Sequence, residues 1–143
     1  MQLLQAGSFL FGVFADDIAA ITAWREPTPL PHAPNSVLGV VSIQGRMLTV
    51  MDLAGMPGSG VASTNAGDRH LVALRGDEQL ALAVDRVGEK IELADRDVDP
   101  KRENAEAFVL GVWSQEGSEV AILNPKKLFP TAIQGRERRR RRF

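Results

Sequence analysis

The stretch VLGVVSIQGRMLTVMDL, Val37 to Leu53, carries the pattern that decides the fold. Two apolar-rich segments lie on either side of the dipeptide Gln44-Gly45, and another glycine, Gly39, stands inside the first segment. Segments of this length around a turn glycine are typical of a β-hairpin. Glycine is favoured where the chain turns tightly or where another backbone segment approaches closely. The stretch therefore predicts a hairpin with its turn at Gly45 and a close backbone approach at Gly39.

This hairpin has a second copy later in the chain. VLGVWSQEGSEVAILNP, Val109 to Pro125, aligns with it at an offset of 72 without a gap, and six of the seventeen positions are identical. The segments before the two copies, MQLLQAGSFLFGVFADDI and HLVALRGDEQLALAVDRV, align more loosely at an offset of 69, with three equivalent pairs at Gly7/Gly76, Asp16/Asp85 and Ile18/Val87. Self-similarity of this kind indicates a structural unit that is repeated.

The repeat predicts an all-β fold. Each copy has the signature of two hairpins joined by a loop, and hairpins this short are not stable alone, so each half is expected to curl its strands into a small barrel that packs on the other. An exchange of strands between the halves stays open. The predicted domain covers 1–135, with lobes at about 1–54 and 69–130 and a polar linker, GMPGSGVASTNAGD, from Gly55 to Asp68.

Helices are expected to be short and few. Asn124 followed by Pro125 has the pattern of an N-cap with proline at the first helical position, and Asp52 stands in the equivalent place of the first copy. The polar segment from Glu92 to Ala107 is expected to be a crossover loop with a short helix. Before the first copy, Pro29, Pro31 and Pro34 are expected to hold the chain extended, because proline restricts its own φ and its predecessor's conformation.

Composition describes an ordinary globular chain. The 143 residues are 44% hydrophobic and 24% charged, and no apolar run is longer than a strand, so no membrane span is expected. The N-terminal MQLLQAGSFLF lacks the basic region of a secretory signal, and the chain has no cysteine. A cytoplasmic location is therefore the expectation.

Charge is distributed unevenly. The net charge is -1, but the segment Arg136 to Phe143 holds six arginines and one glutamate, a local charge of +5, which leaves -6 on the other 135 residues. A block of like charges repels itself and stays solvated, so residues 136–143 are predicted to be a disordered tail. Contact of this tail with nucleic acid, anionic lipid or an acidic partner is the alternative.

No catalytic or metal-binding constellation is visible in the sequence. DRDVDPKRENAE, Asp95 to Glu106, has acids at the spacing of a calcium loop, but Pro100 stands where the loop needs glycine, so calcium binding is not expected. The two histidines, His32 in a proline-rich loop and His70 at the start of a predicted strand, lie in different halves and support neither a zinc site nor a catalytic triad. We expect no enzyme activity, metal, cofactor or small-molecule substrate.

The order of several motifs resembles one family. F-G-V-x-x-D-D-I, P-L-P-x-A-P-x-x-V-L-G-V, I-x-G-R-x-L-x-V-x-D-L and L-A-L-A-V-D-R-V follow one another as in the CheW-like chemotaxis coupling proteins, and the resemblance runs from Met1 to about Phe129. It implies two intertwined five-stranded SH3-like barrels and a non-enzymatic scaffold. The implied partners are the cytoplasmic tip of a chemoreceptor and the regulatory domain of a histidine kinase, with membranes reached only through the receptors.

The resemblance also implies site residues. A groove between the lobes would take the helical tip of the receptor, with apolar walls that include Ala15, Ile18, Ile21 and Val87. The alternative for these side chains is a place in the core. The family's N-L-R-G reads Ser42-Ile43-Gln44-Gly45, so Gln44 replaces an arginine involved in coupling. The resemblance implies that Gln44 and Arg46 are the residues for kinase and receptor coupling. Glutamine lacks the charge and fork of arginine and would hold a carboxylate less well.

A small β-barrel nucleic-acid-binding protein that uses the arginine tail is the competing hypothesis. It lacks the usual platform, because the chain has no tyrosine, Trp24 and Trp113 are isolated, and the body outside the tail is acidic. The scaffold is therefore the favoured function, and an enzyme is the least favoured.

Overall fold

A computed structural model describes residues 1–7, 9–34, 36–53, 69–76, 79–100, 107–115 and 117–128. The predicted linker from Gly55 to Asp68 and the predicted tail from Arg136 to Phe143 lie outside these residues. Within them the regular secondary structure is mostly β-strand, and the helices are single 3-10 turns: η1 (Ala15–Asp17), η3 (Asp95–Asp97) and η4 (Pro125–Lys127).

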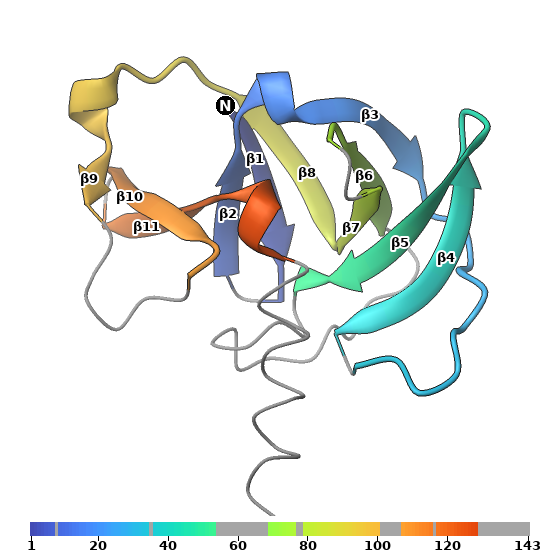
Figure 1. Cartoon of the computed structure of the whole chain (residues 1–143). Coiled ribbons are helices and arrows are strands. Elements are labelled where there is room, and N and C mark those ends of the chain that lie inside the picture. Colours follow the sequence, from blue (N-terminus) through green and yellow to red (C-terminus); the bar gives the residue numbers. More distant parts are fainter. Residues whose placement is uncertain are drawn as a thin grey trace, which may run out of the picture.

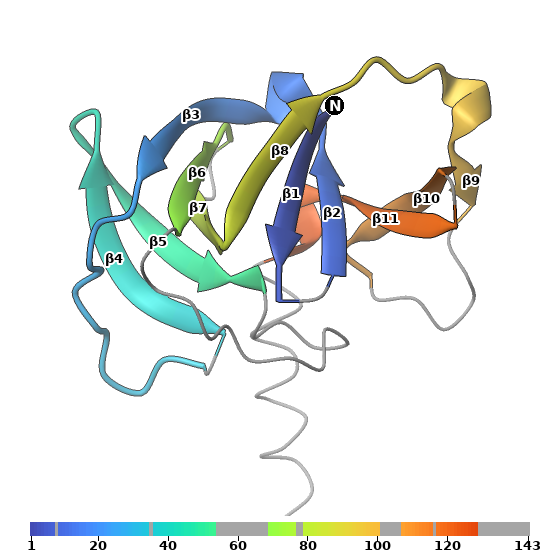
Figure 2. The same ribbon diagram turned by 180° about the vertical axis from the view of Figure 1, so that it is seen from behind.

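The strands follow one another along the chain as β1 (Gln2–Ala6), β2 (Phe9–Val13), β3 (Ile18–Ala23), β4 (Val37–Ile43), β5 (Arg46–Asp52), β6 (His70–Leu74), β7 (Leu80–Val84), β8 (Arg86–Lys90), β9 (Asp99–Pro100), β10 (Val109–Gln115) and β11 (Ser118–Leu123). They form two sheets (Figures 1 and 2). The six-stranded sheet has the order β8-β1-β2-β11-β10-β9, and the five-stranded sheet has the order β3-β6-β7-β5-β4.

Each sheet combines strands from both halves of the chain. The first half contributes β1 and β2 to the six-stranded sheet, and the second half contributes β6 and β7 to the five-stranded sheet. Strands from different halves pair in parallel at two places, β2 with β11 and β5 with β7. The halves therefore exchange strands, and neither half closes a sheet from its own strands alone.

The sequence repeat is also a structural repeat. When β1, β2, β3, β4 and β5 are matched with β6, β7, β8, β10 and β11, the order β3-β6-β7-β5-β4 becomes β8-β1-β2-β11-β10, which is the order of the other sheet. Even the sixth strand has a counterpart, because Thr28 forms an isolated bridge with Val40 just as Asp99 of β9 pairs with Val112. The fold thus has an internal approximate twofold relation.

The four predicted hairpins are confirmed: β1 pairs with β2, β4 with β5, β6 with β7 and β10 with β11, all antiparallel. Gln44 and Gly45 have φ of 52° and 76°, which makes the tip of the β4–β5 hairpin a two-residue turn with positive φ at both residues. At Gly39 an added Cβ would lie 2.1 Å from the carbonyl oxygen of Thr28, so the predicted close backbone approach is also confirmed.

The joining segments differ from the pattern-based prediction. Each copy was expected to carry two hairpins joined by a loop, but the structure has a further strand in each joining segment, β3 in the first half and β8 in the second. Both are edge strands with exposed positions. The sequence of β3 is IAAITA, and the sequence of β8 is RVGEK. Neither sequence alternates clearly between apolar and polar residues, so a pattern of period two could not reveal them.

The smaller predictions agree with the structure. Asn124 caps η4, since its side-chain Oδ1 accepts a hydrogen bond from the Lys126 backbone N at 3.2 Å. The crossover segment contains the short helix η3, and it also contributes β9. His32 is exposed in a loop, and His70 begins β6.

Two hydrophobic cores hold the sheets together. The larger one, here called the shared core, takes residues from both sheets: Leu4, Ala6, Phe11, Val13, Val37, Met51, Leu53, Val72, Leu74, Leu80, Leu82, Val84, Phe108, Val109, Leu123 and Leu128. The second, called the inner core, lies within the five-stranded sheet and consists of Val41, Ile43, Leu48, Val50, Leu71, Ala73, Ala81 and Ala83. Because the shared core needs strands of both sheets, burying it joins the sheets into one unit.

Candidate functional site

The edge strands β3 and β8 place three of the predicted groove residues around the shared core. Ile18 lies opposite Leu74 and Ile21 lies opposite Val72 in the β3–β6 pairing. Residues directly opposite on antiparallel strands share a face of the sheet, and Leu74 and Val72 both belong to the shared core. The face of β3 that carries Ile18 and Ile21 therefore looks on to that core.

Val87 is placed in the same way from the other sheet. It lies opposite Leu4 in the β8–β1 pairing, and Leu4 is a shared-core residue. Ile18 and Val87, which are equivalent in the repeat, both pack against the shared core while staying half-buried. The two edge strands thus bring equivalent side chains to the rim of one hydrophobic core.

The four predicted groove residues differ in exposure. Ile21 is 36% exposed, and Ala15 is exposed in η1, directly before β3. None of the four is fully buried, so their place is the rim of the core and not its interior. Of these four, Ala15 contacts the rim through its backbone, since its carbonyl oxygen accepts a hydrogen bond from the backbone N–H of Ile18. Their role in binding stays a prediction.

Gln44 and Arg46 lie at the exposed tip of the β4–β5 hairpin. The Nη2 of Arg46 donates to the carbonyl oxygen of Gly76, in the turn between β6 and β7, at 3.4 Å. The neighbouring Arg75 donates from Nε to the carbonyl oxygen of Ile18 at 3.1 Å. These contacts connect the hairpin tip to the beginning of β3, so the structure places the two sets of predicted site residues next to each other.

Two further exposed residues at this hairpin were not identified from the sequence. Arg25 donates from Nη1 to the carbonyl oxygen of Ser42 at 2.8 Å, and Met47 is 57% exposed. Met47 lies two residues after the turn, but its exposure depends on the strand face that it occupies, and the sequence pattern does not show that face. Together with Arg46 and Arg75 they give this end of the five-stranded sheet a mixed basic and apolar surface.

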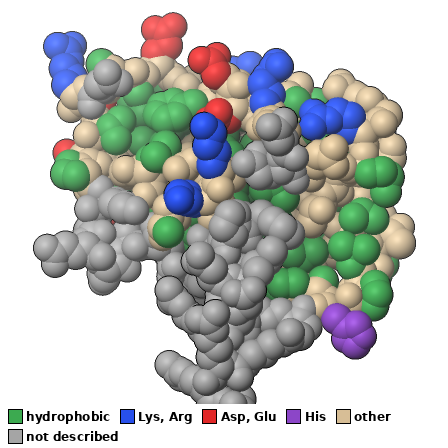
Figure 3. Space-filling model, in the orientation of Figure 1, with side chains coloured by type: hydrophobic (Ala, Val, Ile, Leu, Met, Phe, Trp, Pro, Cys, Tyr) green, Lys and Arg blue, Asp and Glu red, His purple; other side chains and the backbone are tan. Residues whose placement is uncertain are grey.

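Figure 3 shows one face of the molecule as a surface. Apolar side chains reach it in separate areas, and basic and acidic side chains lie between these areas near the upper edge. The described part of this face therefore mixes both signs of charge and does not form one basic stripe of the kind that a nucleic-acid backbone requires.

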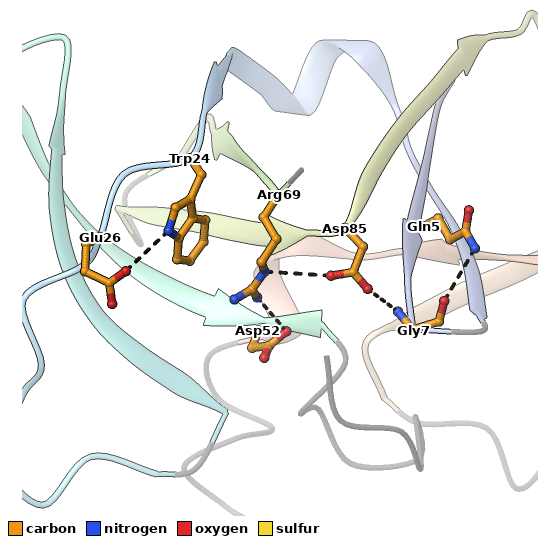
Figure 4. A network of polar contacts seen from close by, with 7 residues as sticks. All are labelled: Gln5, Gly7, Trp24, Glu26, Asp52, Arg69 and Asp85. Atoms are coloured by element: carbon orange, nitrogen blue, oxygen red, sulfur yellow. Dashed lines mark hydrogen bonds and ion pairs between the residues drawn. The ribbon is translucent and has the colours of Figure 1, made fainter. Parts of the chain in front are cut away.

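A partly buried ion-pair network was missed from the sequence (Figure 4). The guanidinium of Arg69 lies between two carboxylates, with Nη2 3.2 Å from Oδ1 of Asp52 and Nε 3.7 Å from Oδ1 of Asp85. Its Cζ lies 4.4 Å from the centre of the Trp24 ring. The four residues lie far apart in the sequence, so only the fold brings them together. We call this network the Arg69 clasp.

The described residues contain no group of three or more His, Cys, Asp or Glu side chains that could hold a metal ion. In the segment with calcium-loop spacing, Asp97 accepts a hydrogen bond through Oδ2 from the backbone N of Ala94 at 3.0 Å, so this carboxylate closes a local turn. The rest of that segment, 101–106, lies outside the described residues. Within the part of the chain that the structure describes, no helix is long and apolar enough to cross a membrane.

Comparison with known proteins finds relatives that are named as CheW proteins. The chemotaxis protein CheW of Rhizobium meliloti is 30% identical over 118 residues, which cover 80% of this chain and 76% of the relative. The chemotaxis protein CheW of Helicobacter pylori is 28% identical, covering 90% of this chain and 82% of the relative. The crystal structure of the scaffolding protein TtCheW from Thermoanaerobacter tengcongensis matches with a TM-score of 0.80 at 22% identity and covers 90% of each chain, which shows a shared fold.

The family comparison covers nearly the whole sequence. The family described as CheW-like domain matches residues 1–132, a range that includes both sheets, the rim of the shared core and the β4–β5 hairpin tip. The predicted resemblance is therefore confirmed, and the chain belongs to the CheW-like domain family.

Proposed function

We propose that this protein is a non-enzymatic chemotaxis scaffold that couples the cytoplasmic tip of a chemoreceptor to the regulatory domain of a histidine kinase. The matched relatives are named as chemotaxis proteins, and the matched structure is named as a scaffolding protein. None of those names points to nucleic-acid binding, and the Arg-rich segment that this alternative needs lies beyond the matched residues 1–132.

One observation carries the proposal for the receptor site. Ile18 and Ile21 from one sheet and Val87 from the other stand at the rim of the shared core without being buried in it. An amphipathic helix binds by placing its apolar face against such partly exposed aliphatic side chains. Residues on rigid strands also cost little entropy to order when a partner binds. The rim therefore suits a preformed helical tip.

Ile21→Glu tests this site at little cost to folding. Because Ile21 is 36% exposed, a carboxylate at this position can stay hydrated, whereas a helix seated on the rim would bury it. We expect the affinity for a chemoreceptor hairpin fragment from the same genome to fall by at least about tenfold, as for a residue at the centre of an interface. Calorimetry would measure the affinity, and thermal unfolding would check the fold.

Leu30→Glu is the matched control, since Leu30 is 42% exposed and lies in the proline-rich loop, which belongs to neither β3 nor β8. It should leave receptor affinity within about twofold, which is the scatter expected for exposed substitutions. Equal losses for the two variants, or no loss for Ile21→Glu in a folded protein, would remove the rim from the proposed receptor site.

The hairpin tip allows a separate test of the kinase side. Gln44→Arg restores the side chain that the family pattern has at this exposed position, and a bidentate arginine holds a partner carboxylate more strongly than glutamine does. We expect the affinity for the kinase regulatory domain to rise by about threefold to tenfold, the net contribution of one exposed hydrogen bond. Gln44→Lys is the control, because it adds the charge without the fork. An unchanged affinity for both variants would separate Gln44 from kinase coupling.

A further inference from the structure

The Arg69 clasp joins the ends of the strands that carry the proposed binding residues. Trp24 directly follows β3, which holds Ile18 and Ile21. Asp85 directly precedes β8, which holds Val87. One guanidinium therefore contacts the ends of the two edge strands that form the rim.

The clasp also connects the two sheets. Asp52 is the last residue of β5, and Trp24 packs against the inner core, so both belong to the five-stranded sheet. Asp85 is attached to the six-stranded sheet: its backbone N donates to the carbonyl oxygen of Gln5 at 2.8 Å, and its Oδ2 accepts from the backbone N of Gly7 at 2.6 Å. Arg69 thus fastens an edge of one sheet to a turn of the other.

The chemistry of the clasp makes it stiff. The side chains of Arg69, Asp52 and Asp85 are 9%, 14% and 18% exposed, so their ion pairs are shielded from water and weakly screened by salt. The planar guanidinium stacks on Trp24 while it faces both acids, an arrangement that lysine cannot reproduce. Nε and Nη2 of Arg69 have no hydrogen bond of good geometry, so the contacts are ionic and stacking contacts.

We propose that Arg69 is a positioning residue for the receptor site: it sets the spacing between β3 and β8 and so preorganises the rim for a helical partner, without touching that partner. This inference rests on the proposed receptor function. Removing Arg69 takes away the guanidinium that faces Trp24, Asp52 and Asp85, so the ends of β3 and β8 lose their common anchor and the two strands sample a wider range of separations.

The spacing can be measured directly because the chain has no cysteine. Ala23→Cys on β3 and Glu89→Cys on β8 introduce two exposed sites for nitroxide labels, and pulsed electron paramagnetic resonance gives their distance distribution. We expect a narrow distribution with Arg69 intact and a broad one with Arg69→Gln. In the unlabelled protein, Arg69→Gln should weaken binding of the receptor hairpin fragment about tenfold, within the range of couplings inside one network.

Val120→Ala is the matched control for lost stability. Val120 is buried in β11 and belongs to neither the shared core nor the inner core, so its truncation lowers the melting temperature without freeing β3 or β8. It should keep the narrow distribution and bind within about twofold of the unmodified chain. Arg69→Lys, which keeps the charge but loses the stacked fork, should lie between the parent protein and Arg69→Gln in both measurements.

The following results would overturn the positioning role of Arg69 or would separate it from the proposed receptor function. Unchanged distances in Arg69→Gln, or broadened distances with unchanged receptor affinity, would overturn the positioning role. If Arg69→Gln does not fold, Trp24→Leu replaces it, because that change removes the contact to β3 and keeps both ion pairs; unchanged distances or affinity would again overturn the inference. If the unmodified protein binds no receptor fragment, the proposed receptor function fails on its own, and the distance measurement still decides whether Arg69 holds the strands.

Discussion

Gly39 shows how much of the fold can depend on a single missing side chain. Its φ is +146°, and an added Cβ would lie 2.1 Å from the backbone oxygen of Thr28, which pairs with the next residue, Val40. Gly111 has the same surroundings in the other half, where a Cβ would lie 2.7 Å from the oxygen of Asp99. The two glycines let the segment before each hairpin lie against its outer strand.

Gly39→Ala is therefore expected to destabilise the protein strongly. The methyl group would have to displace backbone in a conformation that side chains rarely adopt, and we expect a loss of more than about 3 kcal/mol in the free energy of unfolding. Gly45→Ala is the control, since nothing lies within 4 Å of its Cβ position and only its φ of +76° is unfavourable, at a cost of about 1 kcal/mol. Urea unfolding measures both, and equal losses would contradict this explanation.

At the residue scale the sequence identified the glycines correctly but not the clasp. Gly39 and Gly45 could be found because their reasons are local: a turn and a neighbouring segment of the same hairpin unit. Arg69 gave no such signal, because its partners Trp24, Asp52 and Asp85 come from three separate strand ends. Long-range ion pairs require the arrangement of strands, which a single sequence does not show.

At the scale of elements, the hairpins were predictable and the edge strands were not. A hairpin combines two apolar segments with a turn between them, so all of its signals are contiguous. β3 and β8 become strands through pairing with β6 and β1, and these partners lie elsewhere in the chain. Ile18 and Val87 were nevertheless recognised as equivalent, because the repeat aligns them whatever structure they adopt.

The pairing of β1 with β8 depends on the buried side-chain amide of Gln2. The register shifts between Gln2 and Leu4, and the Nε2 of Gln2, a residue that is only 2% exposed, donates to the carbonyl oxygen of Gly88 at 2.7 Å. The side chain thus supplies a donor to β8 at the irregularity. This hydrogen bond replaces ladder pairing at the irregularity, so we infer that Gln2 helps to hold the edge strand that carries Val87.

Gln2→Leu tests how much this hydrogen bond contributes to the pairing of β1 with β8. Leucine has a similar volume but cannot donate to Gly88, and because Gly88 is exposed to water the expected loss in the free energy of unfolding is about 0.5–1.5 kcal/mol, the net contribution of one hydrogen bond. Relative to the parent protein, Gln2→Leu should accelerate hydrogen exchange in β8 more than in β4. Gln5→Leu is the control, because the Gln5 amide only reaches the carbonyl of Gly7, at 3.4 Å. Equal effects of the two changes would count against a special role for Gln2.

At the scale of the whole molecule, the exchange of strands makes the two halves depend on each other. The repeat led to the expectation of two small barrels and left an exchange of strands between the halves open, and in the structure each sheet is completed by two strands of the opposite half. Sequence patterning could not choose between these arrangements, because it shows which face of a strand is apolar and not which strand lies beside it. The shared core also takes residues from both halves.

This topology predicts that neither half folds alone. A fragment of residues 1–68 would contain β3, β4 and β5 without β6 and β7, which lie between β3 and β5 in the sheet, so the two edges of that sheet would have nothing to join them. A fragment of residues 69–143 would have β8 separated from β11 in the same way, since β1 and β2 would be missing. Each fragment would also expose its part of the shared core to water, which removes the main driving force for folding.

Fragment complementation provides the measurement. We expect residues 1–68 and 69–143, expressed separately, each to lack a cooperative thermal transition, and an equimolar mixture to regain the circular dichroism and the transition of the intact chain. Because association then replaces an intramolecular step, the melting temperature of the mixture should rise with concentration. The mixture should also regain receptor-fragment binding, since Ile18 and Val87 reach the rim only when both halves are present. A cooperative transition in either fragment alone would show that one half completes its own sheet and that the exchanged strands are not required for folding.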